Sequence, residues 1–387
     1  MRILMINSVC GIGSTGRICT DLYDELEKEG HECCIAYGRG KANEKYCTYK
    51  IGNRLDNCVH LLGTRLLDRH GFLSTRATTN LVKFIDIYNP DIIHLHNLHG
   101  YFLNVSVLFN YLKDRNIKIV WTLHDSWSYL GHSAYEDDGK ESSKDYPKSL
   151  FTTLKRNKLR KIKVFSNCKN LEIVTPSLWL AEEAKKTFLD QYNITVIPNG
   201  IDLKNFKPSE TKKKYFKSEH KIKILGVAKN WEERKGFQFI DKLSRKYSNR
   251  YEIIVVGKCK PNQTKNSLIK FISETSSVKE LADVYSQADV FINPTLQDNF
   301  PTTNLEALAC GIPVVTFNTG GSPEAIDLYS GVICEEKNVD SLRDGIEMVI
   351  NNEMITSESC LERAKVFNRS NCLKAYIQLY GGVSDEK

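Results

Sequence analysis

Short apolar runs rich in β-branched residues alternate with longer stretches of helical hydrophobic spacing along the whole chain. This alternation indicates α/β domains built on parallel sheets. The clearest helical spacing lies in Arg17 to Glu29 and in Val278 to Ser286. The expected strands of a first series are Arg2 to Asn7, Glu32 to Tyr37, Asp91 to Leu95, Lys118 to Leu123, Glu172 to Thr175 and Thr195 to Ile197. Those of a second series are Lys223 to Val227, Tyr251 to Val256, Val290 to Asn293, Pro313 to Phe317 and Gly331 to Cys334.

The two series are separated by residues 205–221, a segment that is poor in hydrophobic residues and rich in lysine. At about 100 to 200 residues per domain, 387 residues predict two domains with this segment as the linker. We expect an N-terminal Rossmann-like domain over 1–203 and a C-terminal one over 204–365. Helical spacing continues through residues 360–380, so that residues 366–387 either close the second domain or cross back to the first.

Composition and charge exclude several classes of protein. The net charge of +7 is modest for this length, and the most basic run has no interleaved aromatic residues for base stacking, so nucleic-acid binding is not expected. The first apolar run is too short for a secretory signal, and no run reaches the length of a membrane span. The twelve cysteines form no CxxC pair, which predicts free thiols and a reduced cytoplasmic setting.

The first expected strand runs into a glycine-rich turn, Gly11-Ile-Gly13-Ser-Thr-Gly16, and then into a helix. Glycines let a ligand approach the backbone closely, and free N–H groups at a helix start attract phosphate. The spacing alone is a weak signal, because a glycine-rich strand-to-helix turn has the same pattern without a ligand.

Two carboxylates bracket the start of a helix in the second half of the chain. Asp298 lies in the loop after the expected strand Val290 to Asn293, and Glu306 lies about one turn inside the helix that follows Pro301. A second helix start, at Gly320-Gly321, follows the next strand. Open α/β sheets bind ligands at such strand ends, so both acids can face one ligand.

These residues carry a resemblance to a known family. Asp298-x7-Glu306, with Ala-Leu-Ala-Cys-Gly-Ile-Pro and Gly320-Gly321-x-x-Glu324 after it, resembles the E-x7-E region of retaining GT-B glycosyltransferases of family 4. Further matching stretches are Pro198 to Asp202, Arg234-Lys235-Gly236, Asp289 to Phe291, His94 to Asn97 and Thr122 to Asp125. The match spans nearly the whole chain and is similar to a subgroup that builds bacterial surface polysaccharides. It implies two Rossmann-like domains with a deep interdomain cleft.

The resemblance also implies roles for single residues. Glu306 would bind the ribose of a nucleotide-sugar donor, Asp298 the hydroxyls of the transferred sugar, and Lys235 the pyrophosphate. The turn with Gly13 and Gly16 would approach the pyrophosphate from the other domain, and His124 would lie near the transferred sugar. Residues at the start of the helix would line the donor site: Asn299, Phe300, Thr302 and Thr303.

The second phosphate-binding cation is left open. The family has an arginine at the end of the first strand of this domain, where this chain has Lys229; either Lys229 or Arg234 serves, and we favour Arg234. Asp298 replaces a glutamate, which shortens its reach, and Pro301 replaces a common glycine, which removes one N–H. The identity of the sugar therefore stays open.

The expected chemistry needs no protein nucleophile. Cations and helix starts stabilise the departing nucleoside diphosphate, and the acceptor attacks from the same face while the leaving phosphate takes its proton. No resident metal or cofactor is expected. His94, His96 and His99 could ligate a metal, but no cysteine cluster accompanies them, and satisfied histidines are the favoured interpretation. His124 has a purely structural role as its alternative, and orienting His124 is one role open to Asp125.

Leu150 to Lys163 carries six cations and no acid. On a helical wheel Leu150, Phe151, Leu154 and Ile162 share one side, which suggests a basic amphipathic helix that meets an anionic membrane. A solvated face packed on the domain fits equally well.

The predicted function is transfer of a sugar from a nucleotide donor, expected to be UDP-linked, to a glycan or a lipid-linked precursor. The alternatives are a nucleotide-sugar epimerase or hydrolase of the same fold, or a catalytically silent subunit that binds nucleotide sugar or membrane.

Overall fold

The chain folds into two units, Met1–Ile197 with the stretch from Leu373 onward, and Pro198–Cys372. The computed structural model describes residues 1–135, 140–144, 146–211 and 213–381. Each unit has a parallel sheet and its own hydrophobic core. Both are Rossmann-like.

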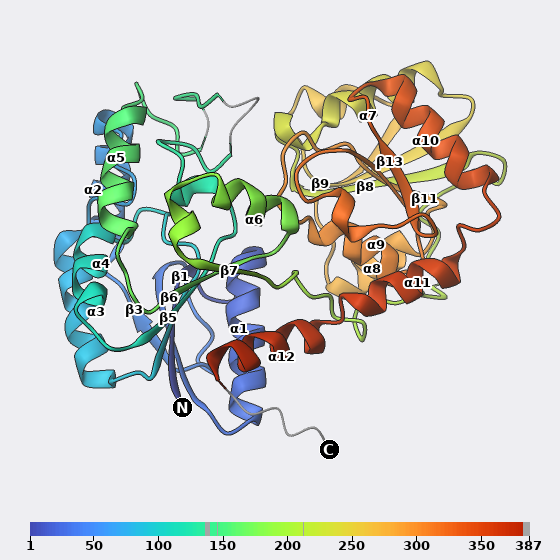
Figure 1. Ribbon diagram of the computed structural model, residues 1–387. Coiled ribbons are helices and arrows are strands. Elements are labelled where there is room, and N and C mark those ends of the chain that lie inside the picture. The colour runs from blue at the N-terminus through green and yellow to red at the C-terminus, as the bar shows by residue number, and fades with distance from the viewer. Residues whose placement is uncertain (136–139, 145, 212, 382–387) are drawn as a thin grey trace. The chain divides into compact units, whose positions relative to one another are not determined.

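The first unit contains a seven-stranded sheet in the order β3-β2-β1-β4-β5-β6-β7. Helices cover both faces, with α1 on one side and α3 and α4 on the other (Figure 1). The strands are β1 Arg2–Val9, β2 Glu32–Arg39, β3 Thr48–Lys50, β4 Ile92–Leu95, β5 Lys118–Thr122, β6 Leu171–Thr175 and β7 Asn193–Val196. The helices are α1 Gly13–Lys28, α2 Arg54–Leu67, α3 Thr75–Tyr88, α4 Val105–Lys113, α5 Leu154–Phe165 and α6 Leu178–Lys185, with short 3-10 helices η1 Ser126–Ser128 and η2 Phe188–Gln191.

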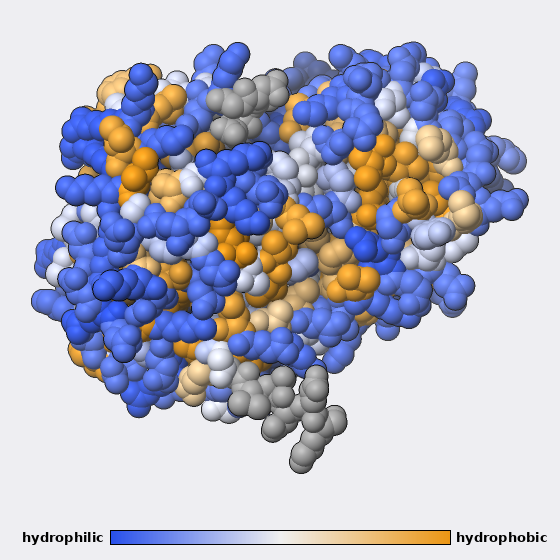
Figure 2. Space-filling model, in the orientation of Figure 1, coloured by the Kyte–Doolittle hydropathy of each residue, from blue (hydrophilic) through white to orange (hydrophobic). Residues whose placement is uncertain are grey.

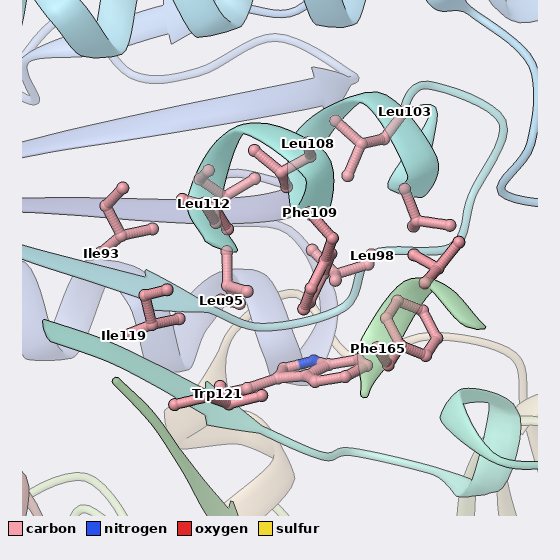
Figure 3. Packing of buried hydrophobic residues seen from close by; sticks show 14 of the residues in the cluster. Ile93, Leu95, Leu98, Leu103, Leu108, Phe109, Leu112, Ile119, Trp121 and Phe165 are labelled. Carbon is pink, nitrogen blue, oxygen red and sulfur yellow. The ribbon is translucent and has the colours of Figure 1, made fainter. Parts of the chain in front are cut away.

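The core of this unit is packed between the sheet and α4 and α5. Phe109 of α4 lies with its ring 5.6 Å from that of Trp121 on β5 and 4.7 Å from that of Phe165 on α5. Figure 3 shows these rings among the aliphatic side chains of β4 and α4. Both faces of the central strands are buried, which is why their sequences read as continuous apolar runs.

The second unit contains a six-stranded sheet in the order β10-β9-β8-β11-β12-β13. Its strands are β8 Ile222–Asn230, β9 Tyr251–Lys258, β10 Ile269–Ile272, β11 Val290–Asn293, β12 Val314–Phe317 and β13 Gly331–Cys334. Its helices are α7 Phe237–Lys246, α8 Val278–Tyr285, α9 Thr302–Ala309, α10 Val339–Asn351 and α11 Ser357–Val366, with 3-10 helices η3 Glu233–Lys235, η4 Gln263–Lys265 and η5 Pro323–Ala325. A final helix, α12 Arg369–Tyr380, begins in the second unit and ends in the first.

Both sheets reverse their strand order once, between β1 and β4 in the first unit and between β8 and β11 in the second. Loops that leave the two central strands at their carboxyl ends diverge there, which leaves room for a ligand. The glycine turn follows β1, His96 and His99 follow β4, and Lys235 and Asp298 follow β8 and β11. His124 follows β5, the neighbour of β4 in the sheet. The topology therefore places these residues at or beside the switch point of their unit.

The units of the structure differ from the predicted domains in two respects. The boundaries lie after Ile197 and Cys372, rather than after residues 203 and 365. Apart from residue 212, which lies outside the described part of the chain, the predicted linker over 205–221 belongs to the second unit. Phe206, Tyr215 and Phe216 are buried in the core of that unit, and these three anchors outweigh the polar composition around them.

The predicted C-terminal helix is two helices. α11 and α12 are separated at Phe367 and Asn368, where Arg369 N–H donates to the carbonyl of Ile201 at 2.9 Å. α12 reaches the first unit, where the hydroxyls of Tyr376 and Tyr380 contact Thr122 at 3.1 Å and His94 at 2.6 Å. Residues 382–387 of the predicted helix lie outside the described residues.

Candidate active site

Lys235 and Asp298 form an ion pair in the second unit. Lys235 ends η3 after β8, and Asp298 lies in the loop after β11. The two loops are held together by further bonds, because Leu296 N–H donates to the carbonyl of Arg234 at 2.7 Å and Arg234 Nη1 donates to the carbonyl of Gln297 at 3.1 Å. The structure therefore brings the predicted phosphate cation and the predicted sugar acid into direct contact.

Gly236 allows this close approach. Its φ is +75°, and a Cβ at this position would lie 1.9 Å from the carbonyl oxygen of Pro294. Any side chain would force the loop that carries Lys235 away from the loop that carries Asp298. The Lys-Gly pair of the motif thus has a steric basis.

The two alternatives for the second cation occupy different places. Arg234 pairs with Glu232 at 3.3 Å and with the Asp298 loop. Lys229 is exposed near the end of β8, within an irregularity in the pairing of this strand with β9. Of these two candidates for the second cation, Arg234 is the one that is bonded to the loop that carries Asp298.

The loop from Asp298 to Pro301 is anchored on both sides. The carbonyl of Asp298 accepts the N–H of Gly321 at 3.2 Å, and a Cβ on Gly320 would lie 2.0 Å from that carbonyl oxygen. Asn299 is buried, and the ring of Phe300 packs 5.5 Å from that of Phe367 in the core. Phe300, which we predicted in the donor site, can therefore offer a ligand its backbone but not its ring.

Helix α9 begins with Thr302 and Thr303, both partly buried, after Pro301 as N-cap. No side chain caps this end. The N–H groups of a first helical turn have no partner inside the helix, so this start carries partial positive charge. Such an end suits a phosphate group.

Glu306 is buried in α9 and accepts a hydrogen bond from the hydroxyl of Tyr285 at 3.1 Å. Tyr285 is the last residue of α8 and is fully buried. Burial and the charge of Glu306 raise the pKa of the tyrosine well above its usual value, so it stays a donor. The sequence analysis missed Tyr285, because its position at a helix end carries no signal of a contact twenty-one residues away.

The glycine turn of the first unit is tight. Gly11 and Gly13 have φ of +67° and +69°, and Gly11 N–H donates to the carbonyl of Gly16 at 3.0 Å. A Cβ on Gly16 would lie 3.1 Å from both Gly11 N and a methyl of Val9. α1 begins at Gly13, four residues before the predicted start at Arg17, so Gly13 and Gly16 lie in its first turn.

His124 lies at the end of β5 with its Nε2 3.1 Å from Nδ1 of His96. Burial lowers the pKa of His124 to about 4, an effect that the charge of Asp125 opposes. His124 is therefore neutral at physiological pH. One nitrogen of the neutral ring can donate a hydrogen bond and the other can accept one.

Asp125 has a different partner from the one we predicted. Its carboxylate contacts His99 Nε2 at 2.6 Å and accepts the N–H of Trp127 at 3.0 Å. Burial acts to raise the pKa of Asp125, but the charge of His99 and these hydrogen bonds outweigh it and lower the pKa. The structure also gives His124 a ring partner in His96.

The rings of His94 and His96 lie 3.9 Å apart. His94 is fully bonded, with Nε2 2.8 Å from the Thr122 hydroxyl and Nδ1 bonded to Tyr380. Within the described part of the chain, no three or more His, Cys, Asp or Glu residues group as a metal site.

The basic run also differs from its prediction. The helix begins at Leu154, so Leu150 and Phe151 precede it. Lys161 is buried and donates to the carbonyls of Trp127 and Leu130, the latter at 2.7 Å. Among the helices that the structure describes, none is long and apolar enough to cross a membrane.

Two family profiles match the chain, one for each unit. Residues 15–205 match the family described as Glycosyltransferase Family 4, and residues 208–367 match Glycosyl transferases group 1. The two matches together leave out only short segments. They confirm the family that the motifs indicated.

Individual proteins agree with these matches. The putative colanic acid biosynthesis glycosyl transferase WcaC of Escherichia coli K12 is 24% identical over 98% of this chain and 99% of its own. A UDP-Gal:alpha-D-GlcNAc-diphosphoundecaprenol alpha-1,3-galactosyltransferase of Escherichia coli is 26% identical over 49% of this chain and 54% of its own. The structure of a sucrose-phosphate synthase from Thermosynechococcus elongatus superposes with a TM-score of 0.75 at 16% identity, over 98% of both chains. The chain therefore belongs to the glycosyltransferases of family 4, which have the GT-B fold.

Proposed function

We propose that this protein transfers a hexose from a UDP-sugar to a glycan or lipid-linked acceptor during the synthesis of a surface polysaccharide, with retention of anomeric configuration. The ion pair between Lys235 and Asp298 carries the proposal, because it places a cation and a sugar-binding acid side by side. Membership of the family supplies the reaction class. The colanic acid enzyme and the galactosyltransferase support the type of product, and the latter also supports a UDP donor.

The donor would bind at the carboxyl ends of β8 and β11. Glu306, held by Tyr285, would accept the ribose hydroxyls. The diphosphate would lie at the start of α9 and exchange places with Asp298 as the partner of Lys235. Asp298, released from the lysine, could then accept hydroxyls of the sugar.

Catalysis in this proposal relies on preorganised charge. The bond between the anomeric carbon and the diphosphate oxygen breaks, and the acceptor oxygen bonds to the same face of that carbon. The proton of the acceptor passes to the leaving phosphate. Lys235, Arg234 and the helix start stabilise the negative charge that develops on the diphosphate, so the positive charge comes from the protein rather than from a metal ion.

The first unit would contribute His124 and the Gly11–Gly16 turn. Neutral His124 can hydrogen-bond a sugar hydroxyl, and the glycine turn leaves backbone N–H groups accessible to a phosphate. Assembly of one site from both units stays a prediction.

Calorimetric titration with UDP tests the nucleotide half of the site. We expect Glu306→Ala to weaken binding at least about tenfold, since hydrogen bonds to a charged group are worth roughly 1.5 to 3 kcal/mol. Glu336→Ala, which removes an exposed acid of the same unit, is the matched control and should bind as wild type. Equal binding by Glu306→Ala and wild type would overturn the ribose assignment.

Turnover tests the reaction. Wild type should release UDP from its UDP-sugar only with acceptor present, and the product should keep the anomeric configuration of the donor by proton NMR. Asp298→Asn should lower kcat while UDP binding stays intact, because Lys235 then has no competing carboxylate. Activity should persist in the presence of a chelator. Epimerisation or UDP release without acceptor would show an epimerase or hydrolase instead, and UDP binding without turnover would show a silent subunit.

A further inference from the structure

Helix α2 presents its polar side to the protein and its apolar side to solvent. His60 and Thr64, on the side of α2 that faces the protein, are buried. On the opposite side Leu55, Val59, Leu62 and Leu66 are 76%, 65%, 59% and 53% exposed. Their spacing of four, three and four residues puts them on one stripe about 17 Å long. A helix packed only for stability has the reverse arrangement.

Hydrogen bonds fix this orientation. His60 Nε2 accepts the N–H of Gly71 at 3.1 Å, and its Nδ1 lies 2.8 Å from the hydroxyl of Ser74. Rotation of the helix to bury the leucines would break the bonds of a buried histidine. The apolar stripe is therefore a permanent surface of the folded unit.

A strongly basic segment adjoins the end of α2. Leu150 N–H donates to the carbonyl of Arg65 at 2.9 Å, and Asn157 of α5 donates to the carbonyl of Asp68 at 2.8 Å. Between residues 148 and 165 the sequence has seven cations and no acid. Lys161 is buried; Lys155, Arg156, Lys158 and Lys163 are exposed. None of the acidic residues that the structure describes forms an ion pair with these four.

Further apolar side chains accompany these cations. Leu150, Phe151 and Leu159 are all exposed. Figure 2 shows hydrophobic residues interspersed with hydrophilic ones over the part of the surface formed by α5. Leucines that are solvent-exposed beside a dense positive charge are typical of surfaces that lie in the interface of a bilayer.

We propose that α2 and the basic segment 148–163 form one docking surface for an anionic lipid bilayer, with the leucine stripe of α2 inserted among the headgroups. Charge selects this occupant. A second copy of the chain would bring two clusters of cations together, whereas anionic headgroups neutralise them. The surface differs from the one that the sequence suggested, because α2 supplies the apolar stripe and α5 supplies mainly charge.

Docking would bring the enzyme to an acceptor carried by lipid, and in that respect it rests on the proposed function. Vesicle binding needs neither donor nor acceptor. A failure of docking is therefore distinguishable from a failure of sugar transfer.

Vesicle flotation of the full chain tests the proposal. The vesicles are phosphatidylcholine alone or an equimolar mixture with phosphatidylglycerol. Wild type should float with the anionic vesicles, and added salt should reduce this. Leu62→Gln/Leu66→Gln and Lys155→Gln/Arg156→Gln/Lys158→Gln should each lower the bound fraction several-fold, and all five side chains are exposed, so the fold is retained.

Matched controls lie in the second unit. Leu268→Gln/Leu328→Gln and Lys242→Gln/Lys279→Gln/Lys337→Gln remove as many leucines and as many positive charges at exposed positions, and these variants should float as wild type. Equal loss with test and control variants would show non-specific attraction and overturn the docking surface. Failure of wild type to float with anionic vesicles would overturn it as well.

Insertion of α2 has a separate readout. Cys58 is an exposed cysteine on this helix, and Cys47 is an exposed cysteine outside it. An environment-sensitive fluorophore on Cys58 in the Cys47→Ser protein should shift to the blue with anionic vesicles. The same label on Cys47 in the Cys58→Ser protein should not. A Cys58 shift that depends on protein concentration and not on vesicles would identify a second copy as the occupant and overturn the membrane assignment.

Discussion

Two side-chain contacts define the resting state of the candidate donor site. Lys235 is paired with Asp298, and Glu306 accepts a hydrogen bond from the hydroxyl of Tyr285. Each contact occupies a group that the proposed substrate needs, but the consequences differ. In the proposed mode a diphosphate displaces Asp298 from Lys235, whereas a ribose binds Glu306 with the Tyr285 contact still in place. We therefore expect the ion pair between Lys235 and Asp298 to break when the donor binds, and the hydrogen bond between Tyr285 and Glu306 to persist.

The variant Tyr285→Phe tests whether the hydrogen bond from Tyr285 is needed for Glu306 to bind UDP. The change keeps the buried ring and removes the hydroxyl that holds Glu306, so UDP affinity should fall by less than the roughly tenfold or greater loss expected of Glu306→Ala. Calorimetry with UDP measures both. Tyr329→Phe, at an exposed position of the same unit, should leave the affinity unchanged. An unaltered affinity in Tyr285→Phe would show that Glu306 needs no support.

At the scale of elements, α5 owes its position to a buried lysine. Lys161 Nζ lies 4.0 Å from the centre of the Trp127 ring and donates to two carbonyls of the segment after β5. Burial lowers the pKa of Lys161 from 10.5 to about 7. The helix is thereby tied to the segment that follows His124 and Asp125.

The buried lysine predicts a dependence of stability on pH. Between about pH 7 and 10.5 the folded protein holds Lys161 neutral while the unfolded chain keeps it protonated, so folding releases a proton and higher pH favours the folded state. The free energy of unfolding of wild type relative to Lys161→Met should therefore rise across this window. Urea titrations at several pH values measure it. Lys163→Met, at an exposed position, should give a constant difference; a constant difference for Lys161→Met would mean that the lysine stays charged.

The sequence predicted regular elements better than their limits. Long buried strands such as β1 and β9 were predicted, because a strand that is buried on both faces of a parallel sheet has a continuous apolar sequence. β3 and β10 were missed, since three or four residues at a sheet edge bury too little to stand out. The break between α11 and α12 depends on a bond from Arg369 to Ile201, which is distant in sequence.

The site shows the same division. Lys235, Asp298 and Glu306 were proposed as site residues from the sequence, because their spacing is local and matches a family pattern. Tyr285 and the pairing of Asp125 with His99 were not, because they depend on how α8 packs on α9 and how the loops after β4 and β5 meet. Contacts between loops of different strands leave no periodic trace in a sequence.

At the scale of the whole molecule, each unit has its own core, and the residues proposed for the nucleotide lie in the second. A ligand that binds only the folded state adds about 2.7 kcal/mol of stability at one hundred times its dissociation constant. UDP should therefore slow amide hydrogen exchange in β11, β12 and α9 more than in β2 and β6. Exchange followed by mass spectrometry of peptides measures this, with Glu306→Ala as control. Equal protection of both units would place the nucleotide elsewhere.

The return of α12 to the first unit has a consequence for synthesis. The strands that contain His94 and Thr122 leave the ribosome early, but Tyr376 and Tyr380, whose hydroxyls bond them, are translated after the whole second unit. The second unit is encoded without interruption and can mature while translation continues. A premature stop codon just before Arg369 would thus leave the N-terminal unit, rather than most of the C-terminal one, without its closing helix.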